Sequence, residues 1–261
     1  MKIDIHLDQS LAPWKQLRHF AASIDGGRFD ALWVLDHFSP LGQNTHSDML
    51  ESVALLGALA ASTERIMLGA LVNNVVNRRP AVIAQAASTL QHISEGRFVL
   101  GLGAGASPTS PFAAEHRSLG IALLPFMQDR HETFEESLIE IRAIWSGERN
   151  SESIFASPSP TPPVVVGVNS VALARRAHTR GCGINVRWNH PQLEKILQAS
   201  TNVESQVDPQ WERSVWMPWN AQLAEPHSME FEPYEKLGVT RIIFLTTEPQ
   251  QLDEIISVAK P

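Results

Sequence analysis

An aspartate and a histidine stand side by side directly after a short apolar run that has the pattern of a β-strand. The pair is Asp36-His37, and the run covers residues 31–35. A carboxylate beside an imidazole could transfer protons, because histidine changes its charge near neutral pH. Asp36 could instead cap the following loop while His37 packs as an ordinary polar residue, and the dipeptide alone does not decide between these roles.

Two other segments could hold a phosphate group. The first is rich in glycine, which lets backbone N–H groups approach an anion closely. The second comes just before an expected helix, whose N-terminus attracts anions, although simple helix capping is the alternative. The segments are Gly103-Ala104-Gly105-Ala106 and Gly167-Val168-Asn169-Ser170. Pro108 and Pro111 stop a helix from opening directly after the first segment, so a dinucleotide fingerprint of the Rossmann type is a poor interpretation.

Two asparagines end a third apolar run at residues 66–72. Asn73 and Asn74 could donate hydrogen bonds to a polar ligand, or they could satisfy the backbone of a loop, which is the more common role of asparagine. The ten histidines show no paired spacing of the kind that zinc enzymes use, and we therefore expect no metal.

Short apolar runs alternate with helical stretches along most of the chain. The alternation predicts an α/β fold of βα units, and eight strands are the number that closes a (β/α)₈ TIM barrel. The ends of the strands that carry the βα loops would then bring the residues above together. Expected strands are 3–7, 31–35, 66–72, 98–102, 164–168, 183–187, 214–219 and 241–245, and expected helices are 50–62, 81–91, 126–145, 171–180 and 250–258.

The length of 261 residues fits one barrel domain spanning 1–261, with an irregular insertion around 103–163. The Ser- and Pro-rich part of the insertion, 151–163, is either a tolerated surface loop or a loop that shapes the mouth of the site. A net charge of −7 without a basic stripe argues against nucleic acid as a partner. No run approaches the roughly 20 apolar residues of a membrane span, so we expect a cytoplasmic protein.

Several motifs, in this order and at these spacings, resemble the luciferase-like monooxygenase superfamily and, within it, the deazaflavin-dependent class. The strongest matches are RIMLG at 65–69, RRPAVIAQA at 78–86 and GRFVLGLGAG at 96–105. Further matches are WVLDHF at 33–38, IWSG at 144–147 and GVTR at 238–241.

The resemblance implies a bacterial luciferase-like barrel that binds a deazaflavin, coenzyme F420, across the ends of its strands and transfers hydride to or from a small organic molecule. It places Asp36 and His37 near the reactive ring, with His37 as the acid or base and Asp36 orienting it or contacting the ring. It implies a cis peptide near Leu71 and Val72 behind the ring, next to Asn73. The phosphate tail would lie against 103–107 and the helix after Gly167, and a homodimer is usual in the family.

This sequence departs from the pattern of some deazaflavin dehydrogenases at two positions. Those enzymes have a glutamate after the glycine loop and a tryptophan shortly after the Asp-His pair, where this chain has Ala106 and Leu41. Two alternatives therefore stay open. One is a monooxygenase of the same superfamily that uses FMN and O₂, and the other is a paralogue that binds the cofactor without turnover.

Overall fold

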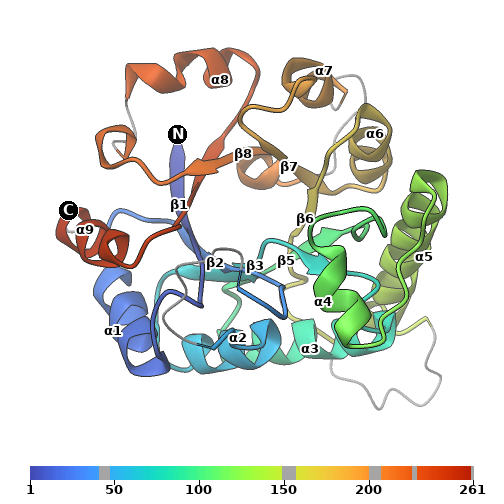
Figure 1. Ribbon diagram of the computed structural model, residues 1–261, viewed down its shortest axis with the longest axis horizontal. Coiled ribbons are helices and arrows are strands. Elements are labelled where there is room, and N and C mark those ends of the chain that lie inside the picture. Colours follow the sequence, from blue (N-terminus) through green and yellow to red (C-terminus); the bar gives the residue numbers. More distant parts are fainter. Residues whose placement is uncertain (41–47, 149–156, 200–206, 225–227, 260–261) are drawn as a thin grey trace.

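The computed structural model describes residues 1–40, 48–148, 157–199, 207–224 and 228–259. Within these residues the strands form one parallel sheet that closes on itself, because β3 pairs with both β2 and β5 (Figure 1). The strands are β1 (Lys2–Leu7), β2 (Ala31–Val34), β3 (Met67–Ala70), β4 (Asn73–Asn74), β5 (Phe98–Gly103), β6 (Val164–Gly167), β7 (Gly183–Arg187), β8 (Arg213–Pro218) and β9 (Arg241–Leu245).

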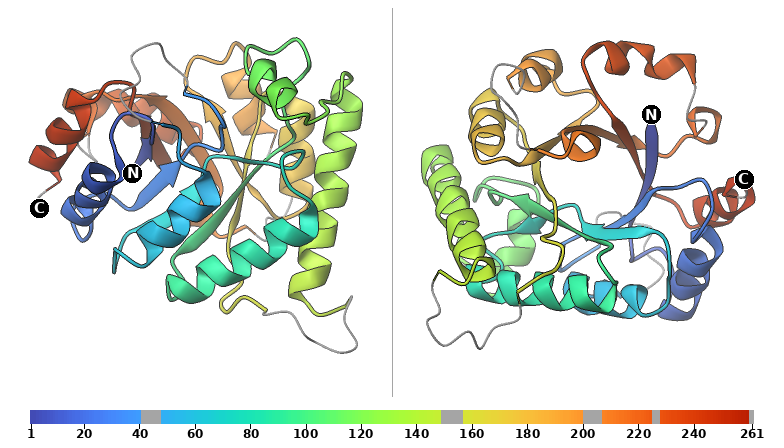
Figure 2. Two further views of the ribbon diagram at one scale, coloured as in Figure 1. Left: turned by 60° about the horizontal axis from the view of Figure 1, so that its bottom comes forward. Right: turned by 180° about the vertical axis from the view of Figure 1, so that it is seen from behind.

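The segments β3 and β4 occupy one position in the barrel, because both pair with β5 and only Leu71 and Val72 separate them. The barrel therefore has eight strand positions, and the predicted (β/α)₈ TIM barrel is confirmed. Helices surround it (Figure 2). They are α1 (Trp14–Ile24), α2 (Ser52–Ala60), α3 (Pro80–Ile93), α4 (Ala113–Ser118), α5 (Met127–Trp145), α6 (Val171–Thr179), α7 (Leu193–Gln198), α8 (Glu232–Lys236) and α9 (Gln250–Val258).

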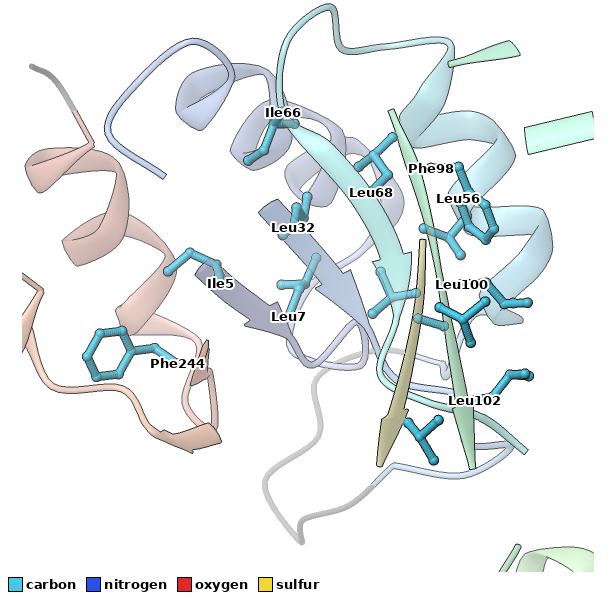
Figure 3. Packing of buried hydrophobic residues seen from close by; sticks show 14 of the residues in the cluster. Ile5, Leu7, Leu32, Leu56, Ile66, Leu68, Phe98, Leu100, Leu102 and Phe244 are labelled. Carbon is cyan, nitrogen blue, oxygen red and sulfur yellow. The ribbon is translucent and has the colours of Figure 1, made fainter. Parts of the chain in front are cut away.

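Side chains alternate between the two faces of each strand, and this alternation separates two kinds of core. Ile3, Ile5 and Leu7 of β1 join a large apolar cluster that includes Leu56 of α2, between the sheet and its helices (Figure 3). Asp4 and His6 lie between these residues and point to the other face, into the barrel. A second cluster, which includes Trp33 of β2, fills the barrel interior.

An ion pair closes the interior at the amino-terminal ends of the strands. Asp4 is fully buried, pairs with Arg241 and accepts a hydrogen bond of 2.8 Å from the indole N–H of Trp33. The guanidinium of Arg241 stacks 3.9 Å from the centroid of the Trp211 ring. Burial raises the pKa of Asp4 to about 6, although Arg241 and Trp33 act in the opposite direction. This end of the barrel is thus sealed by partnered groups.

The irregular insertion holds two helices, α4 and α5, between β5 and β6. Residues 149–156, which begin the predicted Ser- and Pro-rich loop, lie outside the described part of the chain, as does Leu41. Helix α1 was not predicted. Neither were the short helices α4, α7 and α8, whose five or six residues are too few to show a helical period. In the parts of the chain that the structure describes, no helix is both long and apolar enough to span a membrane.

Candidate functional site

A cavity of about 400 Å³ lies at the carboxyl ends of the strands. All eight strand positions contribute to its wall, which is the arrangement expected of a barrel active site. One residue from each position is His6, Leu35, Leu71, Ala104, Gly167, Asn185, Trp216 and Leu245. His37 lines the same cavity, and so does Phe112 of the insertion.

His37 is held in place by a carboxylate that the sequence did not point to. Its Nδ1 lies 2.7 Å from Oε1 of Glu115, on helix α4 of the insertion, and its ring packs against Phe112 with 4.8 Å between the ring centroids. Because the carboxylate accepts the Nδ1–H, a neutral His37 carries its lone pair on Nε2. The histidine is thereby prepared to take up or release a proton at that atom.

Glu115 is well suited to this task because its own charge is stabilised. Its other oxygen, Oε2, accepts hydrogen bonds from the backbone N–H groups of Phe38 and Ser39 at 2.8 and 3.0 Å. Burial raises the pKa of Glu115, but the hydrogen bond and charge of His37 and the two N–H groups outweigh burial, and the pKa lies below its usual value. Helix α4 of the insertion therefore shapes the mouth of the site. The described part of the Ser- and Pro-rich segment does not line this cavity.

The structure corrects the expectation that Asp36 orients His37. Both oxygens of Asp36 are occupied elsewhere: Arg78 binds them at 2.8 and 2.9 Å, and Ser52 and the backbone N–H of Asn74 donate further bonds. Burial raises the pKa of Asp36, but these donors lower it more, and the net shift is downward. Asp36 is buried and does not line the cavity, so the structure makes it an anchor for the ends of β2 and β4.

A cis peptide joins Leu71 and Val72, at the position that the family resemblance implied. Both residues line the cavity. The side chain of Val72 packs over two strand glycines, where a Cβ on Gly103 would come within 2.5 Å of Val72 and one on Gly167 within 3.1 Å. The glycines thus leave the space that this bulge in the barrel wall occupies.

Only some residues of the predicted phosphate-binding segments line the cavity. Ala104, Gly105, Gly167, Val168 and Asn169 line it. Asp36 aside, four other predicted cofactor residues do not line it, and Ala106 is one of them. Gly103 lies beneath Val72, Asn73 donates to the carbonyl oxygen of Gly101, and Ser170 caps α6 by accepting from the N–H of Leu173.

His6 and Glu115 are two titratable site residues that the sequence analysis did not single out. Glu115 lies 78 residues from His37, and no local pattern connects them. His6 had a signal, since the alternation in β1 places it on the same face as Asp4, inside the barrel.

Replacement of Asp36 by Asn tests its assignment as an anchor. We expect the free energy of unfolding to fall by about 3–5 kcal/mol, because Arg78 then loses its buried ionic partner. Urea unfolding measures the change. Asp30→Asn is the matched control, because Asp30 pairs with the exposed Lys2 and its replacement should cost at most about 1 kcal/mol. Equal effects of the two substitutions would contradict the assignment.

Replacement of Glu115 by Gln should destabilise the protein in a pH-dependent way. The lowered pKa of Glu115 means that its stabilisation is fully present above 4.5, the usual value, and is lost as the pH falls through the folded-state pKa. The difference in unfolding free energy between wild type and variant should therefore stay constant from about pH 7 down to about pH 5 and shrink as the pH falls below 4.5. A difference that does not shrink below pH 4.5 would show that the pKa of Glu115 is not lowered in the folded protein.

Comparison with known proteins agrees with this geometry. Residues 2–206 match the family model described as luciferase-like monooxygenase. An F420-dependent glucose-6-phosphate dehydrogenase from Beutenbergia cavernae is 30% identical over 186 residues, which cover 67% of this chain and 53% of that protein. The chain spans about half the length of most of the curated relatives that it matches.

Solved structures show the same fold at low sequence identity. An F420-dependent secondary alcohol dehydrogenase, solved in complex with an F420–acetone adduct, has a TM-score of 0.73 and 16% identity, covering 99% of this chain and 98% of that one. A monooxygenase from Streptomyces bottropensis has a TM-score of 0.72 and 18% identity, covering 99% and 96%. With its barrel, its cis peptide and the family match over residues 2–206, the chain belongs to the luciferase-like monooxygenase family.

Proposed function

We propose that this chain is an F420-dependent oxidoreductase that transfers hydride between the coenzyme and an organic substrate. The observation that carries the proposal is His37 at the mouth of the barrel, with Nδ1 held by the ionised Glu115. Support also comes from curated relatives such as the Beutenbergia cavernae protein, which is named as F420-dependent. The fold itself does not distinguish dehydrogenases from monooxygenases, because both occur among the similar structures.

The residues of the cavity fit a flat, largely apolar ring with a phosphate-bearing tail. Leu71, Val72 and Trp216 provide apolar walls, and the volume of about 400 Å³ lies in the range of small-molecule sites. Asn169 lines the cavity just before α6, whose N-terminal N–H groups favour a phosphate. When bound, the deazaflavin would supply or accept the hydride at its ring carbon C5.

His37 would accept or donate the proton that accompanies the hydride. Oxidation of an alcohol releases a hydride from carbon and a proton from oxygen, and the lone pair on Nε2 of His37 can accept that proton. The carboxylate of Glu115 then stabilises the imidazolium through the Nδ1–H bond. In the reverse direction, the same nitrogen donates the proton to a carbonyl oxygen. His37 is therefore the catalytic residue of the proposal, and Glu115 positions it.

Replacement of His37 by Ala should lower kcat by about 10²–10⁴-fold, the usual contribution of a general acid or base. Binding of the deazaflavin should change little, because His37 supplies only one part of the wall. The assay follows the visible absorbance of the deazaflavin with a panel of alcohols and ketones. His92→Ala, on the exposed end of α3, is the control and should leave turnover unchanged. Full turnover by the His37 variant would overturn the role of His37. If the wild type turns over none of the substrates, a paralogue that binds the cofactor without turnover is favoured instead.

A further inference from the structure

His6 is a buried histidine whose ring faces the cavity without a hydrogen-bond partner. Its side chain lies on the inner face of β1, and the residue is only 5% exposed. Neither Nδ1 nor Nε2 forms a hydrogen bond within the described part of the chain. Buried polar atoms in folded proteins nearly always have a partner, so two unpartnered nitrogens in one ring need an explanation.

The surroundings of His6 keep its ring uncharged. Burial and the nearby charge of His37 together lower the pKa of His6 to about 3, although the backbone of Val34 acts in the opposite direction. A neutral imidazole has one N–H donor and one acceptor nitrogen. It can therefore hydrogen-bond a hydroxyl or a carbonyl, but it offers no positive charge to an anion.

The rest of the cavity has the same character. None of the described residues that line it is Lys, Arg, Asp or Glu, and most are apolar, such as Leu35, Phe112 and Leu245. The start of α6 would hold the phosphate of the coenzyme, but a phosphate or carboxylate of a substrate placed beside Leu35 and Leu245 would lose its hydration without gaining a cationic partner. An uncharged molecule that carries one oxygen atom would match both the apolar wall and the two histidines.

We propose that His6 hydrogen-bonds the oxygen of an uncharged alcohol or ketone and thereby selects this substrate class. The inference rests on the proposed function, because it concerns the substrate of that same site. His37, whose charge is close enough to act on His6, would exchange the proton at the substrate oxygen, while His6 holds that oxygen in position. The named substrate of the Beutenbergia cavernae relative, glucose 6-phosphate, falls outside the class.

The first test uses the stability of the protein without any ligand. His6→Phe keeps a ring in the same space and removes the two unpartnered nitrogens. The unfolding midpoint should rise by about 2–4 °C, because an unsatisfied buried polar group destabilises the folded state. A fall in the midpoint would mean that His6 supports the fold, which would overturn the proposal. His6→Gln, which restores a donor and an acceptor, should lie near the wild type.

The second test measures ligand binding and turnover with cyclohexanol, cyclohexanone and glucose 6-phosphate. Binding of the deazaflavin, followed by tryptophan fluorescence, should differ by less than about threefold among wild type, His6→Phe and His6→Gln, since His6 holds the substrate and not the coenzyme. For cyclohexanol, kcat/KM should fall by about 10–100-fold in His6→Phe and recover in part in His6→Gln. The control is His178→Phe, which alters another buried histidine with an unpartnered nitrogen, on α6 and not among the cavity-lining residues, and it should leave kcat/KM unchanged.

The histidine ring signals in an NMR spectrum provide a readout that does not depend on turnover. Cyclohexanone should shift the signals of His6, which are identified by their loss in His6→Phe. Three outcomes would each overturn the role of His6. They are His6 signals that do not shift with cyclohexanone, a kcat/KM that is higher for glucose 6-phosphate than for cyclohexanol, and a loss of deazaflavin affinity together with substrate turnover in the His6 variants. Shifted His6 signals in a protein that does not turn over any alcohol would instead support His6 and contradict the proposed function.

Discussion

Closing a parallel sheet into a barrel sends every second side chain of each strand into an interior that holds little water, and a polar group there needs a partner. Most of the interior meets this requirement with its own residues. Asp4 has Arg241 and Trp33, and Asn185 donates to the hydroxyl of Ser214. His6 is different, because its neighbours on the cavity side satisfy neither nitrogen. Of these interior polar groups, His6 is thus the one left available at the open end, where a ligand can bind.

The open end depends on a second set of contacts outside the barrel interior. Asp36 and Arg78 tie the end of β2 to the segment after β4, and this pairing fixes the position of the bulge at Leu71 and Val72. Glu115 then connects α4 to the loop after β2 through His37 and the N–H groups of Phe38 and Ser39. Asp36 therefore stabilises the scaffold of the open end, while Glu115 positions His37, the residue that we propose to transfer protons.

The sequence predicted the fold better than the roles of the site residues. Short apolar runs identified all eight strand positions, because burial on both faces of a barrel strand leaves a strong local signal. The position of His37 at a strand end followed from the same argument. The role expected of Asp36 did not hold, because a dipeptide does not show which way each side chain points. Glu115 could not be found at all, since its pairing with His37 depends on how the insertion folds back over the barrel.

The central claim is that the mouth of this barrel binds a deazaflavin, and a titration of the purified protein tests it most directly. Trp216 lines the cavity, so binding should quench tryptophan fluorescence, and Trp216→Phe should remove most of that change. We predict that coenzyme F420 binds at least about tenfold more tightly than FMN, a difference of roughly 1.4 kcal/mol in binding free energy. Tighter binding of FMN would contradict a deazaflavin site and indicate a monooxygenase that uses O₂. Binding of neither would contradict both cofactor assignments and leave the barrel fold unaffected.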